Sequence, residues 1–348
     1  MTDWKRYVLW ILAVYLILLL IPLPLLGKDS EGGHTELPLV RPSTTESSES
    51  SSSSPNSSSP AKGTAVFRLL DEETGTVYEV ADRDFVVGTV AAEMYPTYHA
   101  EALKAQAVAS YTYYSVQRAQ ERADPDAALK GADFTDTLSG LPRYYSDKEL
   151  KERWGENYEA YHKKVTEAVD AVFGRTITYN GELILAAYHA ISSGATEDAV
   201  LVWGSSLPYL QPVASPGDKL SPSYQSTVSF TADELKSKLV SLEGCTLGDD
   251  PAGWIAADPK VSASGTVTGI VIGGVEMTGK QVRELLGLRS ACFTAAYDNG
   301  RFVFNVLGYG HDVGMSQYGA DYMARQGSNW EDILHYYYTG VVITEPAG

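Results

Sequence analysis

The sequence predicts an α+β fold in which helices are mixed with antiparallel strands. Segments typical of strands alternate with segments typical of helices, but without the regular strand–helix–strand order of an α/β sheet. The pair Asn180-Gly181, between two apolar runs, is the sequence signal of a tight antiparallel hairpin. The chain of 348 residues is 44% hydrophobic, which is enough for at least one sizeable core.

Two paired strands and a short helix are expected at the start of the globular part. The segment 71–75, Asp-Glu-Glu-Thr-Gly, is a turn sequence, so Val66–Leu70 and 77–80 are predicted to pair as strands. Asp84 is the expected N-cap of the following helix. Pro96 ends that helix, because a proline restricts the residue before it to extended conformations.

Two longer helices follow. The first is expected to be capped by Thr97 and to end near Arg122, and apolar residues on nearly all of its sides predict a buried position. Residues 125–150 have an irregular pattern. The second helix is expected over 154–173 and is ended by Gly174.

Strands dominate the next part of the sequence, and two helices end it. The segment 231–241 has the composition of a helix start. Gly327 ends the first C-terminal helix, and a capping box at 328–331 begins the second, which is expected to reach Gly340. The strands are expected at Thr176–Tyr179, 183–188, 209–214, 225–230, 260–264, Val267–Ile272 and 303–306.

The N-terminal region is typical of a membrane anchor. Residues 7–27 contain no charged side chain, and as a helix they would span roughly 30 Å, the thickness of a bilayer core. Lys5 and Arg6 precede this segment, which predicts that residues 1–6 are cytoplasmic and the rest of the chain is outside. A cleaved signal peptide is the alternative, but the apolar run is long for one and no Ala-x-Ala site follows it.

Residues 28–64 are predicted to be a flexible linker. The stretch 43–60 holds 11 serines and almost no apolar residue, so ordering it would bury too little surface to offset the lost entropy. The globular domain is therefore expected to cover residues 65–345.

The net charge and the cysteines limit the possible functions. A formal net charge of −17 argues against nucleic acid as a partner, because proteins that bind it need a basic face. Cys245 and Cys292 belong to no Cys/His cluster, which argues against a zinc site. They form either a disulfide or two separate thiols, and the sequence leaves both possibilities open.

Glu93 is the candidate general acid. It lies between apolar residues at the end of a short helix, just before Pro96. A carboxyl group in apolar surroundings has a raised pKa, because loss of hydration disfavours its charged form, and this keeps a proton available near neutral pH. The alternative is an exposed glutamate at a helix end, which would carry no chemistry.

Two further segments are rich in polar and small residues. Segment 188–197 contains His189 and several hydroxyl groups, so it either lines a polar groove or is an ordinary exit from a strand. Segment 308–319 holds four glycines together with His311, which is typical of a tight loop in a site or in a core. Neither segment fits a hydrolase nucleophile elbow or a phosphate-binding loop.

Together these segments resemble the stage II sporulation protein D family, also called the SpoIID/LytB domain. The resemblance covers roughly residues 65–345 and implies one catalytic domain with two lobes. Its strongest blocks are Ala92-Glu-Met with Glu101-Ala-Leu-Lys-Ala-Gln-Ala-Val-Ala109, His311 to Ala320, and Tyr336-Tyr-Tyr-Thr-Gly340. Weaker blocks are 188–197, Val202-Trp-Gly204, Pro208-Tyr-Leu210 and Gly287-Leu-Arg-Ser290.

This resemblance implies a lytic transglycosylase of sporulation, a lyase that thins the septal cell wall during engulfment. Such an enzyme acts on peptidoglycan strands from which a partner amidase has removed the peptides. Glu93 falls on the family's catalytic glutamate. It would protonate the glycosidic oxygen between N-acetylmuramic acid and N-acetylglucosamine. Its carboxylate would then take the proton of the C6 hydroxyl, which closes on C1 to give a 1,6-anhydro end.

The resemblance also implies further site residues and partners. No metal ion and no cofactor is expected. The expected partners are peptidoglycan glycan strands, an amidase and membrane proteins of an engulfment complex, on the extracytoplasmic side of the sporulation septum. Groove residues that orient the sugar are expected to be Lys104, Gln106, His189, Ser193, Thr196, Glu197, His311, Gln317 and Tyr318.

The sequence departs from the family pattern at several positions. Tyr111 stands where many members have arginine, Ser193 where a glycine is usual, and Asp312 where a glycine lies beside the histidine. Ala190-Ile191 replaces Ser-Thr. These changes bear on substrate contact and rate. Two other functions remain open: a glycan-binding protein that stimulates an amidase without cutting, and a structural scaffold at the septum.

Overall fold

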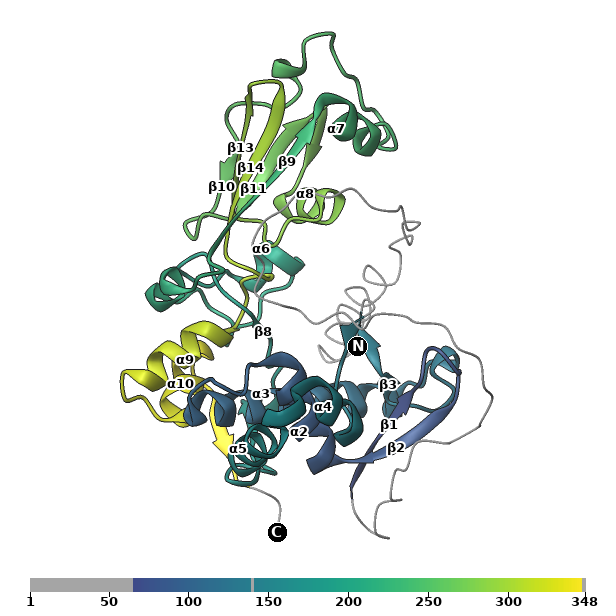
Figure 1. Ribbon diagram of the computed structural model, residues 1–348, viewed down its shortest axis with the longest axis vertical. Helices are drawn as coiled ribbons and strands as arrows, with labels where there is room; N and C mark the ends of the chain where they lie inside the picture. Colours follow the sequence, from purple (N-terminus) through teal and green to yellow (C-terminus); the bar gives the residue numbers. More distant parts are fainter. Residues whose placement is uncertain (1–64, 139–140, 346–348) are drawn as a thin grey trace. The chain divides into compact units, whose positions relative to one another are not determined.

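Helices and small, mostly antiparallel sheets are mixed along the chain, which confirms the predicted α+β class (Figure 1). The computed structural model describes residues 65–138 and 141–345. The predicted cytoplasmic tail, anchor and linker lie outside the described residues. Within the part of the chain that is described, no helix combines the length and the apolar character needed to cross a bilayer.

The N-terminal hairpin leads directly into the helix that carries Glu93. Strands β1 (Val66–Leu70) and β2 (Val77–Ala81) pair antiparallel, as predicted. Helix α2 (Asp82–Glu93) follows β2 without a loop, so the prediction of Asp84 as its cap is wrong. Asp84 lies instead in the first turn, where its charge favours the helix dipole.

Helix α3 (Ala100–Ala123) is buried along much of its length. It contacts α2, α5 (Tyr158–Asp170), α9 (Gln317–Arg325) and α10 (Trp330–Tyr337). The prediction of Thr97 as its cap is wrong. His99 is the cap, and its ring accepts a hydrogen bond from the Glu101 N–H. Thr97 belongs to the preceding turn, in which the Tyr98 N–H donates to the Tyr95 carbonyl.

The helix predicted over 154–173 is confirmed with shorter bounds as α5 (Tyr158–Asp170), and a separate helix that was not predicted precedes it. Helix α4 (Asp147–Trp154) begins inside the region predicted to be irregular, where Ser146 forms a capping box. It stops at Gly155, whose φ of 50° does not fit an α-helix, and α5 (Tyr158–Asp170) follows after one 3-10 turn. The irregular region also contains β3 (Phe134–Thr135), β4 (Thr137–Leu138) and β5 (Leu141–Pro142).

The hairpin predicted at Asn180-Gly181 is confirmed. Both residues have positive φ, and they join β6 (Thr176–Tyr179) to β7 (Glu182–Leu183). The prediction of one strand over 183–188 is wrong, because the chain turns locally between its two ends: the Ala187 N–H donates to the Leu185 carbonyl at 2.8 Å. Pairing resumes only at β8 (Tyr188–His189).

Apolar side chains form three clusters among the described residues, the smallest being an aromatic one around Phe67, Phe85 and Phe134. The main core is built largely from α2, α3, α5, α9 and α10. A second core lies wholly within residues 225–307, which we call the small lobe. The small lobe contains β9 (Gln225–Thr231), α7 (Ala232–Leu239), β10 (Lys260–Val261), β11 (Val267–Ile272), β12 (Val275–Met277), α8 (Gly279–Leu286), β13 (Phe293–Asp298) and β14 (Arg301–Leu307).

Two strand predictions differ from the structure in this half of the chain. Segment 209–214 forms no strand, and only Ala214 makes an isolated bridge, to Ala195. Strand β10 stops at Val261, because the chain then turns back tightly on itself: the Ser262 N–H donates to the Thr266 carbonyl. Helices α6 (Ala199–Trp203) and α8 were not predicted.

The C-terminal helices are confirmed, but with shifted bounds. Helix α9 (Gln317–Arg325) is followed by α10 (Trp330–Tyr337), which ends before Gly340. The capping box is formed by Asn329 and Asp332 and not by 328–331, because the Ser328 N–H closes the end of α9 on the Met323 carbonyl. Strand β16 (Val342–Thr344) then pairs with β6.

Candidate active site

The two polar segments of the sequence lie side by side. Strand β8 pairs in parallel with β15 (Met315–Ser316), which brings residues 188–189 beside 315–316. Ile191 and Tyr309 exchange backbone hydrogen bonds, and the Tyr318 N–H donates to the Ala190 carbonyl. Residues far apart in the sequence therefore meet at the start of α9.

Glycines make this close contact possible, as the sequence predicts. Gly308, Gly310 and Gly314 have φ values of 79°, 135° and 74°, which other residues rarely adopt. A Cβ on Gly314 would also lie 2.1 Å from the Ala187 carbonyl oxygen. The loop before α9 can thus pack against the strand exit only with glycine at these positions.

Glu93 belongs to a closed ring of polar side chains, which we call the Glu93 ring. Gln317 Nε2 lies 3.3 Å from Glu93 Oε2 and 3.3 Å from Gln106 Oε1. Gln106 Nε2 donates to Ser110 Oγ at 3.0 Å, and the Ser110 hydroxyl donates to the Tyr188 hydroxyl at 3.5 Å. The Tyr188 hydroxyl in turn hydrogen-bonds Glu93, so α2, α3, β8 and α9 each contribute to the ring.

Burial raises the pKa of Glu93 above its ordinary value. The residue is half-buried at the C-terminal end of α2, where the helix dipole also disfavours a negative charge. Hydrogen bonds from Gln317 and Tyr188 and the positive charge of Arg143 act against this and lower the pKa. The protonated form is therefore more stable than in a free glutamate, while the carboxylate form has partners that can stabilise it.

Arg143 is a buried cation that acts on Glu93. Its guanidinium lies 5.6 Å from the ring centroid of Phe134 and 6.0 Å from that of Tyr114, within range of cation–π attraction. Its Nε donates to the Thr137 carbonyl at 2.8 Å, whereas Nη1 has no hydrogen-bond partner among the described residues. Arg143 therefore supplies positive charge that would stabilise an ionised Glu93.

Asp218 fixes the position of the segments around the Glu93 ring. It is completely buried and accepts hydrogen bonds from the hydroxyls of Ser192 and Ser316 and from the Ser192 N–H. Ser316 also caps α9, of which Gln317 is the first residue. Because Asp218 holds Ser316, it indirectly holds Gln317 against Glu93.

His189, His311 and Asp312 form a second buried group, which we call the histidine cluster. The two histidine rings lie 5.7 Å apart, and His189 Nε2 lies 3.9 Å from Asp312 Oδ1. Neither of these two atoms has a hydrogen-bond partner among the described residues. Burial lowers the pKa of His189 to about 3 and that of His311 to about 4, and it raises the pKa of Asp312 well above its usual range.

Several of the predicted groove residues have other partners in the structure. Lys104 Nζ pairs with Glu101 at 2.6 Å, and Tyr318 donates its hydroxyl to the Leu220 carbonyl at 3.2 Å. Ser193, Thr196 and Glu197 contact the small lobe: Ser193 donates to the Ser264 carbonyl, the Thr196 carbonyl accepts from Ser264, and Glu197 accepts from Ser262. Of the predicted groove residues, Gln317 thus bonds Glu93 and Gln106 bonds Gln317. The five residues named in this paragraph as predicted groove residues make other contacts.

Sequence reasoning did not single out Ser110, Tyr188, Arg143 or Asp218. The four-residue spacing of Gln106 and Ser110 on α3 places both on one helix face, and this was an available signal. Tyr188 begins the segment 188–197 that the sequence marks, whereas no local pattern marks Arg143 or Asp218, which reach the site only through the tertiary fold.

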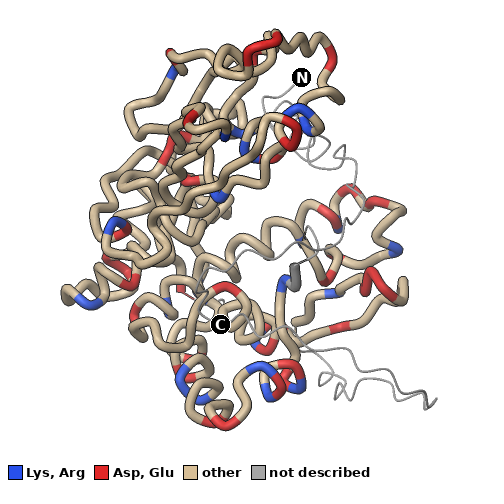
Figure 2. Tube along the Cα trace, turned by 45° about the horizontal axis from the view of Figure 1, so that its top comes forward, with Lys and Arg blue, Asp and Glu red and all other residues tan. Residues whose placement is uncertain are grey.

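The described residues hold no group of three or more His, Cys, Asp and Glu side chains that could bind a metal ion. Both cysteines are free: Cys292 is buried, and Cys245 is partly buried. Acidic residues are spread over the described chain, with lysines and arginines interspersed among them (Figure 2). The two signs of charge are therefore intermixed along the chain.

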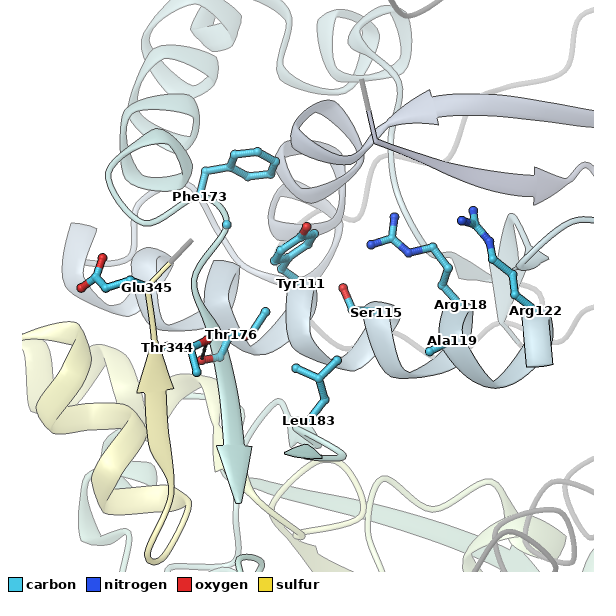
Figure 3. A pocket seen from close by; sticks show the side chains of 11 residues that line it. Tyr111, Ser115, Arg118, Ala119, Arg122, Phe173, Thr176, Leu183, Thr344 and Glu345 are labelled. Atoms are coloured by element: carbon cyan, nitrogen blue, oxygen red, sulfur yellow. Dashed lines mark hydrogen bonds between the residues drawn. The ribbon is translucent and has the colours of Figure 1, made fainter. Parts of the chain in front are cut away.

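A separate pocket lies along α3 but does not include Glu93 (Figure 3). Tyr111 lines it, and its hydroxyl donates to Asp82 at 3.2 Å. Two arginines in its wall are already paired, Arg118 with Asp82 and Arg122 with Asp133. The unusual tyrosine at position 111 therefore contributes to this pocket and is not part of the Glu93 ring.

Comparison with known proteins places the chain in a family. The family model described as "Stage II sporulation protein" matches residues 71–179. The chain is 38% identical to stage II sporulation protein D of Bacillus subtilis, over 80% of this chain and 78% of that protein. The protein of the same name from Bacillus amyloliquefaciens is 40% identical over 78% and 76%. A more distant relative, the amidase enhancer of Bacillus subtilis, is 26% identical over 74% of this chain and 40% of its own length.

The two relatives named stage II sporulation protein D match 80% and 78% of this chain, each at more than 30% identity. The family resemblance found in the sequence is thereby confirmed, and the chain belongs to the stage II sporulation protein D (SpoIID) family.

Proposed function

We propose that the protein is a peptidoglycan lytic transglycosylase that cleaves the bond between N-acetylmuramic acid and N-acetylglucosamine in peptide-stripped strands. Glu93 is its catalytic residue. As an acid it donates a proton to the glycosidic oxygen while the sugar develops oxocarbenium character at C1. As a carboxylate it accepts the proton of the C6 hydroxyl, whose oxygen bonds to C1 and forms the 1,6-anhydro end.

The observation that carries this proposal is the environment of Glu93. Burial favours the protonated acid that the first step needs, and the residue keeps enough exposure for a proton to be passed outward. Gln317, Tyr188 and Arg143 favour the carboxylate that the first step leaves behind. A single carboxyl group in such surroundings can serve as acid and then as base, as the two steps require.

The proposal includes a location and partners. The apolar segment 7–27 anchors the chain in the cell membrane, and the serine-rich linker extends the catalytic domain to the cell wall on the outer side. The sporulation septum is the proposed site of action, during engulfment. An amidase that strips peptides from the wall, and membrane proteins of the engulfment complex, are the proposed partners.

Product analysis tests the activity. Purified full-length protein is incubated with peptide-stripped glycan strands, and the products are identified by mass spectrometry. Anhydro-muramyl ends should accumulate with the wild type, and Glu93→Gln should lower the initial rate by at least about 10²–10⁴-fold. Glu152 is an exposed residue of α4, and the matched control Glu152→Gln should keep the wild-type rate. Reducing ends in place of anhydro ends would show hydrolysis and contradict the proposal.

The second candidate is an amidase enhancer that binds glycan without cutting it. The similarity to a protein named amidase enhancer supports this alternative. It predicts that the Glu93→Gln protein still stimulates a partner amidase on intact cell wall as strongly as the wild type. Loss of anhydro ends together with unchanged amidase stimulation in that variant would favour this second function.

A further inference from the structure

Three tyrosine rings form a continuous row, which we call the tyrosine row. The ring centroids of Tyr95 and Tyr98 lie 5.8 Å apart, and those of Tyr98 and Tyr318 lie 6.3 Å apart. Tyr95 is 67% exposed, the largest exposed fraction among the large hydrophobic residues that the structure describes as exposed. Tyr95 therefore presents its ring to solvent, whereas Tyr98 and Tyr318 are partly buried and support it from below, Tyr98 meeting Tyr318 edge to face.

The row starts and ends beside the Glu93 ring. Tyr95 follows Glu93 by two residues, directly after the end of α2. Tyr318 follows Gln317, whose side chain bonds Glu93. Both ends of the row are thus joined through the backbone to residues whose side chains touch in the candidate active site.

The backbone beneath the row is held from several sides. Asp321 accepts a hydrogen bond from the His99 N–H at 2.6 Å, and Arg325 donates to the Thr97 carbonyl at 3.3 Å. Lys164 Nζ donates to the Tyr98 carbonyl at 2.6 Å. A binding surface that is already ordered loses little conformational entropy when a ligand arrives.

We propose that the tyrosine row is a sugar-stacking subsite that binds a pyranose ring of the same glycan strand beside the bond that is cleaved. This inference rests on the proposed function. Aromatic faces carry a partial negative charge that attracts the C–H groups of a sugar ring, and phenolic hydroxyls can bond its polar groups. Arg325 and Asp321 neutralise each other at 2.7 Å beneath the row, so the surface suits an uncharged N-acetylhexosamine.

Direct binding tests this subsite. The probe is a set of fluorescently labelled, peptide-stripped glycan strands sorted by length, titrated with full-length protein in a Glu93→Gln background that prevents cleavage. Adding Tyr95→Ala should raise the dissociation constant for long strands about five- to tenfold. The dissociation constant for the shortest strand that still binds should change little. Tyr95→Trp, which keeps a stacking face, should retain the affinity.

A second exposed tyrosine is the control for the substitution itself. Tyr336 is 40% exposed on α10, and Tyr336→Ala should leave the affinity for glycan unchanged. An unchanged melting temperature for Tyr95→Ala would show that the fold is intact, as expected for an exposed ring.

The outcomes separate this subsite from the proposed activity. Equal affinity of the Tyr95→Ala and parent proteins for strands of every length would overturn the subsite, whether or not the wild type cuts glycan. Lost binding of a partner amidase with unchanged glycan affinity would also overturn it, and would assign the row to a protein partner. Weaker glycan binding without any anhydro products from the wild type would keep the subsite and reject the transglycosylase.

Discussion

The Glu93 ring and the histidine cluster both bury ionisable side chains near the start of α9, but they differ in how the polar atoms of these side chains are hydrogen-bonded. In the ring, each of the five side chains contacts two others. In the cluster, His189 Nε2 and Asp312 Oδ1 face each other at 3.9 Å, and neither has a hydrogen-bond partner among the described residues.

This difference shows what each region is built to do. An acid that must lose and regain a proton needs neighbours that stabilise both of its forms, and the Glu93 ring provides them. In the histidine cluster burial instead disfavours the charged form of each group, because it lowers the histidine pKa values and raises that of Asp312. We therefore expect substitutions in the ring to change activity and substitutions in the cluster to change mainly stability.

The largest effect that separates the two regions is expected for Gln317→Leu. This change removes a hydrogen bond to Glu93 that favours the carboxylate. A hydrogen bond to a charged group contributes about 1.5–3 kcal/mol, so the initial rate of anhydro-end formation should fall about 10–100-fold. The rate is measured on peptide-stripped strands at saturating concentration.

The control for that variant is Gln326→Leu at the exposed end of the same helix, which should keep the wild-type rate. A Gln317→Leu protein with the full rate would mean that the ring plays no part in the chemistry. The Glu93 ring would then not differ from the histidine cluster in its effect on activity.

The fold could be predicted where local chemistry decides it. Strand Val267–Ile272 and the hairpin at Asn180-Gly181 follow from apolar patterning and turn residues alone. The cap of α3 could not be predicted, because Thr97 is drawn into a turn that also bonds Arg325 from the other end of the chain. Strand 209–214 failed for a similar reason, since its segment finds no neighbouring strand to pair with along its length.

The candidate site could be predicted only in part. Glu93 and Gln317 lie in blocks that the sequence marks clearly, and they do meet. The same reasoning placed Ser193 and Glu197 among the groove residues that orient the sugar, but their side chains bond the small lobe, whose position a linear pattern cannot give. Arg143 lies in a segment without a recognisable motif, so only the folded chain reveals its charge near Glu93.

The pH dependence of stability gives a smaller but more specific effect. His189 and His311 have folded pKa values of about 3 and 4, below the ordinary 6.5, so unfolding takes up protons as the pH falls below about 6.5. Each histidine therefore lowers the free energy of unfolding by up to about 1.4 kcal/mol per pH unit between pH 6.5 and 4. His311→Gln should flatten the measured dependence by up to that amount, as followed by urea unfolding at several pH values.

The exposed His335 on α10 provides the matched control, and His335→Gln should keep the wild-type slope. The groups facing the cluster include Arg283, Lys280, Glu197 and Asp218, and the two variants retain all of them. A His311→Gln protein with the wild-type slope would mean that His311 is not kept neutral by the fold.

The last test is Asp312→Asn, which decides how the cluster is charged. Burial favours the protonated form of Asp312, whose shape an asparagine reproduces, and asparagine tolerates the φ of 63° at this position. A carboxyl with a raised folded pKa destabilises the fold as the pH rises above its ordinary pKa, so removing it should raise the free energy of unfolding at pH 7, by up to about 1.4 kcal/mol for each pH unit of the upward shift. The alternative is a charged pair with His189, which would be broken by the substitution at a cost of about 3–5 kcal/mol. Chemical denaturation at pH 7 separates these values, because a neutral cluster and a buried ion pair cannot give the same result.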